Sequence, residues 1–129
     1  MQKLDEMNCP CCSGKTYENC CEPYHLGKDL PQTPEQLMRS RYTAFALVLT
    51  NYLVETTHFS TRKDNDFSDI EDRAKSNKLL KLEIVFAKEN KVRFRAFYQD
   101  KNNEIYEHDE LSTFTQENGK WFYVDGEFY

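Results

Sequence analysis

The sequence lacks the long apolar run that a membrane-spanning helix requires, because no stretch approaches roughly 18 apolar residues. Its opening residues, MQKLDEMN, contain neither the apolar segment nor the small-residue cleavage site of a secretory leader. We therefore predict a soluble, cytoplasmic protein whose cysteines stay reduced. An excess of positive charge is also missing, since the formal net charge is −5. This balance disfavours nucleic acid as a partner, because the short pairs Arg39 with Arg41 and Arg93 with Arg95 are the main basic clusters.

Aromatic residues, in contrast, are plentiful. Nine Phe, eight Tyr and one Trp argue against disorder, although the mean hydropathy is −0.83. A chain of 129 residues has room for one ordinary domain and a small appendage that cannot bury a sufficient core alone. We predict a cysteine-rich module with its linker over residues 1–30 and an α+β domain over residues 31–129.

The appendage is defined by its cysteines, which lie in the stretch CPCCSGKTYENCC. Cys9 and Cys11 form one close pair, and Cys20 and Cys21 form another. Structural zinc is tetrahedral and accepts four thiolates, so two short pairs on a tight loop suit it. We predict that these four cysteines hold a structural zinc ion, and that the nearby His25 is a bystander.

A disulfide framework is the alternative to zinc. Cys20 and Cys21 are poorly placed to bridge each other, but cross-pairing with Cys9 and Cys11 is open on the residues alone. A reducing compartment favours the metal. For the fifth cysteine, Cys12, three roles are open: a substitute ligand, a redox-sensitive thiol or an ordinary loop residue. The last is preferred, because a thiolate beside a dianionic cluster is repelled.

Several motifs resemble known families. The following residues resemble the SEC-C motif, the zinc-binding module also found at the carboxyl end of the SecA translocation ATPase: Cys9-x-Cys11, Ser13-Gly14-Lys15, Tyr17 and Cys20-Cys21. The rest of the chain resembles the YchJ-like family in TPEQLMRSRYTAFAL (residues 33–47), His58, Ser60-Thr61-Arg62, Glu110-x-Ser112-x-Phe114 and Trp121-x-Tyr123-x-Asp125-Gly126. The resemblance implies a cone-like domain, as in ketosteroid isomerase and nuclear transport factor, behind the zinc module. Cys12 departs from the motif, which usually carries glycine there.

Local patterns predict helices first and strands last. Thr33 is the expected N-cap of a long helix, with Gln36 completing a capping box. This helix has an apolar stripe at Met38, Tyr42, Phe45 and Leu49. A short helix is expected from about residue 50 to 57, and another from the capping box Ser68-x-x-Glu71 to Asn77.

From Leu79 onward the apolar period changes to two, which is typical of strands. Four strands are predicted near residues 79–86, 92–98, 105–115 and 121–125, with tight turns between them. Sequential antiparallel strands form a meander. The fold class is therefore α+β, with helices packed on a curved antiparallel sheet.

A pocket in the cone has five polar candidates: Arg41, His58, His108, Glu110 and Asp125. We expect Arg41 either to pair with Glu110 or to extend its head to water. The functional interpretation of the pocket is a general acid/base site around Glu110. The preferred interpretation is structural, with a buried ion pair beside an exposed histidine.

Two functions follow from this sequence. The first is a non-enzymatic zinc-binding protein whose module, by analogy with the SecA tail, presents Lys15, Tyr17 and Tyr24 to a protein partner. The alternative is a small-molecule binder or a lyase/isomerase-type enzyme that uses the cone cavity. Four thiolates leave no open coordination position, which disfavours a catalytic metal. A homodimer formed through the sheet is a further possibility.

Overall fold

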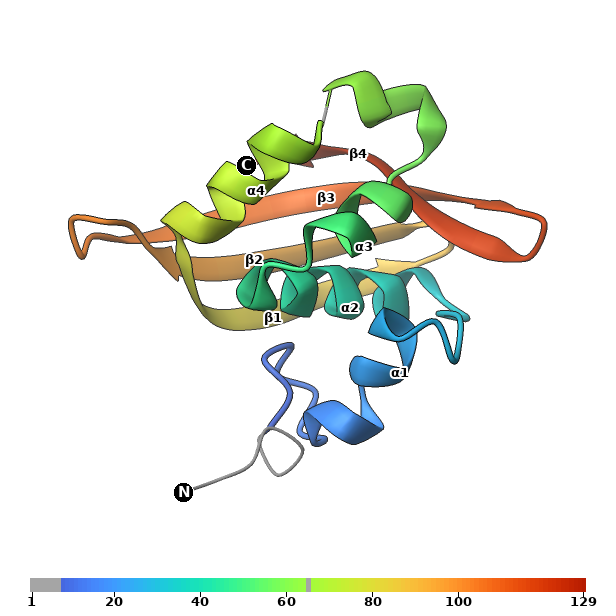
Figure 1. Ribbon diagram of the computed structural model, residues 1–129, viewed down its shortest axis with the longest axis horizontal. Coiled ribbons are helices and arrows are strands. Elements are labelled where there is room, and N and C mark those ends of the chain that lie inside the picture. The colour runs from blue at the N-terminus through green and yellow to red at the C-terminus, as the bar shows by residue number, and fades with distance from the viewer. Residues whose placement is uncertain (1–7, 65) are drawn as a thin grey trace.

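The computed structural model describes residues 8–64 and 66–129, so residues 1–7 of the predicted module lie outside the described part (Figure 1). The elements are the 3₁₀ helix η2 (Tyr17–Asn19), α1 (Glu22–His25), α2 (Pro34–Leu47), α3 (Thr50–Glu55), the 3₁₀ helix η3 (Phe59–Asp64), α4 (Phe67–Ser76), β1 (Lys78–Lys88), β2 (Lys91–Gln99), β3 (Ile105–Glu117) and β4 (Lys120–Phe128). The strands form one antiparallel sheet in the order β1-β2-β3-β4. This confirms the predicted α+β class and the meander.

Helix α2 begins as its sequence predicts. The Thr33 hydroxyl accepts a hydrogen bond from the Gln36 amide, at 3.1 Å. The Gln36 side chain, predicted to accept from the Thr33 amide in a capping box, accepts instead from the amide of Gln32, one residue before the cap. The helix ends at Leu47 because Val48 adopts a left-handed φ of 57°. Leu49, which we expected in the apolar stripe of this helix, instead precedes α3 as its N-cap.

Helix α4 begins two residues earlier than its capping box predicts. The cap is Asp66, whose carboxylate accepts from the Asp69 amide at 2.9 Å, and Ser68 lies inside the helix. A carboxylate at this position also interacts favourably with the helix dipole. Ile70 and Ala74, one turn apart, are the buried residues of α4 and face the core.

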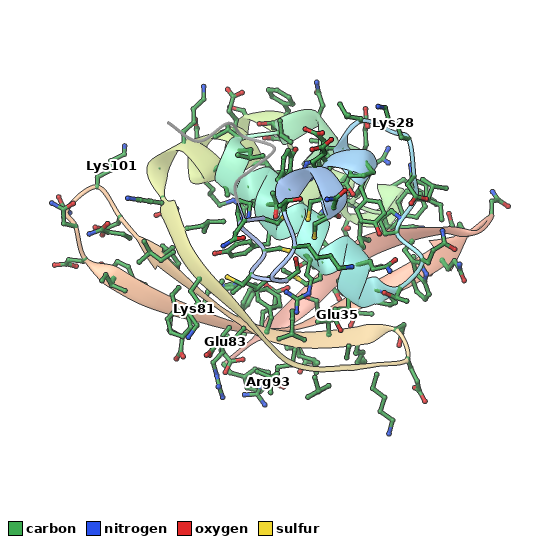
Figure 2. The ribbon with its side chains drawn as sticks, turned by 90° about the horizontal axis from the view of Figure 1, so that it is seen from below. Lys28, Glu35, Lys81, Glu83, Arg93 and Lys101 are labelled. Atoms are coloured by element: carbon green, nitrogen blue, oxygen red, sulfur yellow. The ribbon has the colours of Figure 1, made fainter. Side chains whose placement is uncertain are left out.

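The sheet is bent by irregularities in its pairing. Register shifts interrupt β1 against β2 at two places and β3 against β4 between Thr113 and Phe114. Such bulges increase twist and curvature. Helix α2 packs against β1, β2 and β4. The other face carries charged side chains, among them Glu83 and Arg93 (Figure 2), and Arg93 pairs with Asp109 at 3.0 Å.

The main core runs from the sheet through α2 into the cysteine-rich segment. Its buried members are Cys9, Cys11, Tyr17, Cys21, Leu37, Met38, Tyr42, Leu82, Val92, Phe94, Ala96 and Phe114. A smaller cluster joins α2, α3 and α4 through Ala44, Leu53 and Ile70. Apolar burial is therefore continuous across the boundary predicted at residue 30. In the described part of the chain, no helix has the length and apolar content needed to cross a membrane.

Candidate metal centre and cavity

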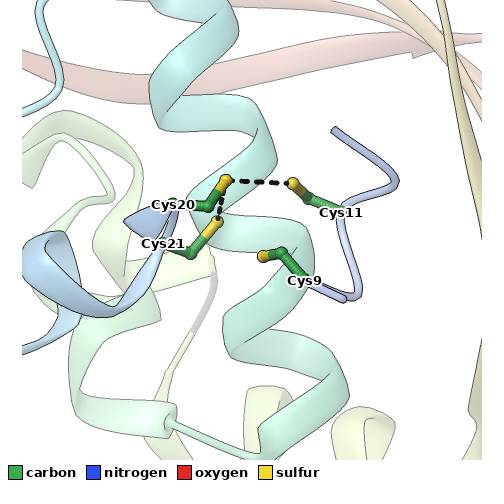
Figure 3. A group of neighbouring side chains, drawn as sticks. All are labelled: Cys9, Cys11, Cys20 and Cys21. Atoms are coloured by element: carbon green, nitrogen blue, oxygen red, sulfur yellow. Dashed lines mark hydrogen bonds between the residues drawn. The ribbon is translucent and has the colours of Figure 1, made fainter. Parts of the chain in front are cut away.

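Four cysteine sulfurs converge beside α2. Those of Cys9, Cys11, Cys20 and Cys21 all lie within 4.8 Å of one another. The Cys11–Cys20 sulfur distance is 3.6 Å and the Cys20–Cys21 distance is 3.8 Å (Figure 3). A tetrahedron of sulfurs, each about 2.3 Å from a zinc ion, has edges of about 3.8 Å. A disulfide requires about 2.05 Å, and all five cysteines are free.

A closed loop presents the first cysteine pair. The Cys9 amide donates to the Lys15 carbonyl at 2.8 Å, and the Cys12 amide donates to the Cys9 carbonyl at 3.1 Å. Gly14, with a φ of 88°, and Cys12, with a φ of 65°, both adopt left-handed conformations. The backbone at Cys12 therefore favours glycine. The Cys12 side chain is exposed, lies outside the four-sulfur cluster and accepts from the Leu82 amide at 3.5 Å.

Polar groups of the protein surround the sulfurs. The Ser13 hydroxyl lies 3.2 Å from the Cys20 sulfur, and the Thr43 hydroxyl lies 3.5 Å from the Cys9 sulfur. Thr43 belongs to α2, so the cluster contacts the long helix directly. Hydroxyl donors of this kind stabilise thiolates and orient metal ligands.

The four thiols are too close to ionise independently. Hydrogen bonds with Cys21 and Cys9 hold the pKa of Cys11 well below its ordinary value. Burial raises the pKa of Cys20 to about 11, and hydrogen bonding with Cys11 raises that of Cys21. One thiolate is therefore favoured, while further ionisation is opposed by repulsion between like charges. A divalent cation would remove that opposition, and its binding would release protons.

His25 fixes the module to α2 and is not part of the sulfur cluster. Its Nδ1 lies 2.7 Å from the Tyr17 hydroxyl, and its Nε2 lies 2.8 Å from the Ser40 carbonyl. The carbonyl can only accept, so Nε2 donates to it, and in the neutral ring Nδ1 accepts from Tyr17. Burial lowers the pKa of His25, which favours this neutral form.

The predicted partner surface is only partly exposed. Tyr17 is 5% exposed and engaged with His25, so the expectation that it faces a partner is wrong. Lys15 is exposed and Tyr24 is half-buried. Apolar burial at the 3₁₀ helix η2 takes Tyr17 into the core instead.

A cavity of about 330 Å³ lies between α2, α4 and the inner face of the sheet. His108 and Glu110 line it from β3, and Arg41 lines it from α2. These are three of the five predicted pocket residues. Along β3 every second residue from Glu110 to Phe114 is buried, namely Glu110, Ser112 and Phe114.

The Glu110 carboxylate accepts three hydrogen bonds. His108 Nε2 lies 2.8 Å from Oε1, and the hydroxyls of Ser112 and Tyr123 donate to Oε2 at 2.6 and 2.9 Å. Burial alone would raise the pKa of Glu110. These donors outweigh that effect and hold the pKa below its ordinary value, so the carboxylate is ionised.

The predicted pairing of Arg41 with Glu110 is wrong. Arg41 Nη1 donates instead to the Leu53 carbonyl at 2.9 Å and to the hydroxyls of Thr56 and Thr57 at 2.7 and 3.2 Å. Arg41 forms no ion pair with any residue in 8–64 or 66–129. The alternative, extension to water, is wrong too, because the residue is only 8% exposed.

His58 and Asp125 lie outside the cavity. His58 Nδ1 contacts the Ser60 hydroxyl at 2.7 Å, and Nε2 contacts Glu117 at 3.0 Å. Asp125 is exposed because the register shift between β3 and β4 reverses which residues of β4 face the core. Asp125 pairs with Thr113, whereas the inward-facing Tyr123 pairs with Phe114.

Sequence reasoning missed three cavity features. Neither Ser112, which shares a face with Glu110, nor Tyr123 was expected to donate a hydrogen bond to the Glu110 carboxylate. Arg73 also lines the cavity. It follows the buried Ile70 by three residues on α4, and this spacing could have indicated its direction.

The architecture is that of an NTF2-like α+β domain preceded by a four-cysteine segment. The chain belongs to the YchJ family: the family model described as "YchJ, middle NTF2-like domain" matches residues 33–126. A UPF0225 protein of Actinobacillus succinogenes is 40% identical over 123 residues, covering 91% of this chain and 79% of the relative. A UPF0225 protein of Vibrio cholerae is 38% identical over 128 residues, covering 95% and 83%.

Two solved structures are similar over most of the chain. The solution structure of a SEC-C motif containing protein from Rhodopseudomonas palustris matches with a TM-score of 0.88 at 35% identity, covering 94% of this chain and 98% of that one. The crystal structure of a SEC-C motif containing protein from Psychrobacter arcticus matches with a TM-score of 0.80 at 31% identity, covering 95% and 82%. The match to SEC-C proteins and the four-sulfur cluster are consistent with metal binding.

Proposed function

We propose that the protein binds a structural zinc ion through Cys9, Cys11, Cys20 and Cys21, and that the ion holds the N-terminal module against α2. The spacing of the four sulfurs carries this proposal, because it matches the edges of a zinc–thiolate tetrahedron. Free thiols in this arrangement suit a reducing compartment. When bound, zinc would supply the positive charge that four ionised thiols require.

Zinc content tests the proposal directly. Protein purified under reducing conditions without chelator should contain about one zinc ion per chain by mass spectrometry of the metal. Cys20→Ser should lose most of that zinc. Cys12→Ser is the matched control and should keep it, because its sulfur lies outside the cluster. Wild-type protein without zinc, or Cys20→Ser with a full complement, would refute the assignment.

The metal should also stabilise the cone-like domain against unfolding. Cys9, Cys11 and Cys21 share the main core with residues of α2 and the sheet. Chelation should therefore lower the urea midpoint of the whole domain, with the near-ultraviolet signal of Trp121 and the sheet signal changing together. A cone that unfolds at an unchanged midpoint after zinc loss would show that the module contributes nothing to the common core.

We further propose that the module binds a protein partner. The support is its exposed surface: Lys15 is exposed, Tyr24 is half-buried, and the following Leu26 and Leu30 are 58% and 45% exposed. Leu26→Ser should retain zinc yet lose partners that co-purify with the wild type. Leu80→Ser, at an exposed position of β1, is the matched control and should keep them. Equal recovery with both variants would argue against this surface.

A further inference from the structure

The cavity contains a buried cation that forms no ion pair with any residue in 8–64 or 66–129. Arg41 is 8% exposed, and burial lowers its pKa to about 10. Its charge is met by a carbonyl, two hydroxyls and the face of Tyr123, whose ring centroid lies 4.6 Å from the guanidinium carbon. A buried charge is ordinarily paired with an opposite charge, because dipoles compensate only part of its lost hydration.

Half of the guanidinium also lacks acceptors. All three hydrogen bonds of Arg41 use Nη1, and over residues 8–64 and 66–129 neither Nε nor Nη2 has a protein acceptor. Neither atom is completely enclosed, since Thr50 Oγ1 is the single fully buried side-chain polar atom without a partner in those ranges. Arg41 lines the cavity. With Nη1 already bonded, the Nε–Nη2 edge is the part of the guanidinium that is left for a ligand in the cavity.

Glu110 forms no ion pair with Arg41 and acts on it only through space. Both oxygens of that carboxylate are already occupied, by His108 on one side and by Ser112 and Tyr123 on the other. A second arginine, Arg73, also lines the cavity, and its side chain has no hydrogen-bond or ion-pair partner in the part of the chain that the structure describes. Two arginines thus face one carboxylate, which leaves the cavity positive when His108 is neutral.

The remaining walls of the cavity are apolar. They include Met38, Phe45, Ile70, Leu79, Phe94 and Ala96. The volume of about 330 Å³ lies at the lower end of the range for small-molecule sites. The space therefore combines a cationic donor edge with an apolar wall and suits a small amphipathic ligand.

We propose that this cavity binds a small organic carboxylate with an apolar body. The carboxylate pairs with the Nε–Nη2 edge of Arg41, which offers two parallel donors in the geometry that carboxylates accept. Arg73 adds long-range attraction from the rim, and the apolar body packs between α2, α4 and β2. This site is separate from the four cysteines.

Paired ligands test the proposal on the full-length, metal-loaded protein. Cinnamate and cinnamamide share an aromatic body, while octanoate and octanamide share a linear one. In amide-resolved NMR titrations, at least one acid should bind roughly tenfold or more tightly than its amide, because a charge-assisted bidentate pair is replaced by a neutral contact. The shifted signals should lie in α2, α4 and β2. Comparing the two acids distinguishes a ring from a chain as the preferred body.

Three variants test whether Arg41 and Arg73 bind the carboxylate of the ligand. Arg41→Lys keeps the charge but loses the two-donor edge, so the acid should bind roughly tenfold more weakly in protein whose spectrum remains folded. Arg73→Gln, at an exposed position of α4, should weaken the acid by roughly threefold and leave the amide unchanged. Lys75→Gln removes the same charge from the same helix outside the cavity lining and should change neither.

Specific results of these titrations would contradict the proposal that the cavity binds a carboxylate. Acids that bind no better than their amides, or that do not bind at millimolar concentration, would overturn the proposal. So would equal effects of Arg73→Gln and Lys75→Gln, because the attraction would then come from the overall charge of the helix. The Arg73 comparison decides the matter even if Arg41→Lys does not fold.

Discussion

Removing the hydroxyl of Tyr123 isolates one of the three donors to Glu110. In Tyr123→Phe the ring can still pack edge-to-face on Phe114, 5.9 Å away, and lie under Arg41. The lost interaction is the 2.9 Å hydrogen bond to Glu110 Oε2, a carboxylate that is 6% exposed. Hydrogen bonds to charged groups contribute about 1.5–3 kcal/mol. We therefore expect a loss of about 2 kcal/mol in the free energy of unfolding near pH 7.

The pH dependence of that loss identifies its cause. The folded-state pKa of Glu110 lies below its ordinary value of 4.5, so ionised Glu110 stabilises the fold above that pH. This stability is lost as the pH falls through the folded-state pKa. Without the Tyr123 donor, the pKa of Glu110 should rise towards its ordinary value. The difference between wild type and variant should thus be full near pH 7 and shrink as the pH falls below 4.5.

Urea unfolding followed by circular dichroism measures the effect. With a denaturant slope of about 2 kcal/mol per molar, the midpoint of Tyr123→Phe should fall by about 1 M. Tyr98→Phe is the matched control: Tyr98 also lines the cavity, but its hydroxyl bonds to no described residue, so its change should stay within about 0.5 kcal/mol. Equal effects of the two substitutions, or a Tyr123 effect that is independent of pH, would refute this account of Glu110.

Three further predictions concern other contacts. Because the folded-state pKa of His25 is lowered from 6.5, the unfolded chain binds the proton first. Wild-type stability should therefore fall relative to His25→Gln as the pH drops below 6.5, and a constant difference in urea titrations would contradict this. Gly126→Ala should cost about 1–3 kcal/mol in thermal or urea unfolding, since a Cβ there would overlap the Glu110 carboxylate; an unchanged midpoint would mean that the carboxylate moves freely. Asp66→Ala should cost about 1 kcal/mol by the same measurement, and Ser68→Ala should cost less, because Asp66 is the cap of α4; the reverse order would place the cap at Ser68.

The elements that sequence predicted well are those fixed by local chemistry. Thr33 caps α2 because its hydroxyl and the Gln36 amide are only three residues apart. The strands follow from an apolar period of two, and Asn118-Gly119 makes the tight turn between β3 and β4 with both residues at positive φ. The four cysteines could likewise be predicted to form one metal site, since the spacing within each pair is short.

The misplaced residues depend on contacts between distant segments. Tyr17 looks like a surface residue of a polar loop, yet its hydroxyl meets His25 and its ring is buried in the main core. The exposed orientation of Asp125 depends on a bulge that reverses the alternation of β4. The sequence contains no pattern from which this bulge could be predicted. The partners of Arg41 are a carbonyl and two hydroxyls from the end of α3 and the residues after it, so a search for carboxylates along the sequence could not find them.

Helix α2 uses more than the one apolar stripe that its sequence predicts, because it contacts both the cysteine cluster and the cavity. Its Arg39 donates to the Cys11 carbonyl at 2.7 Å, and its Thr43, one turn later, contacts Cys9. Its Arg41 and Phe45, also one turn apart, line the cavity instead. The metal centre and the cavity thus lie on different faces of one helix. Because a packed helix moves as a unit, loss of the metal should shift NMR signals around Arg41 even though no cysteine lines the cavity. Signals there that are unchanged on chelation would show that α2 is held by the sheet alone.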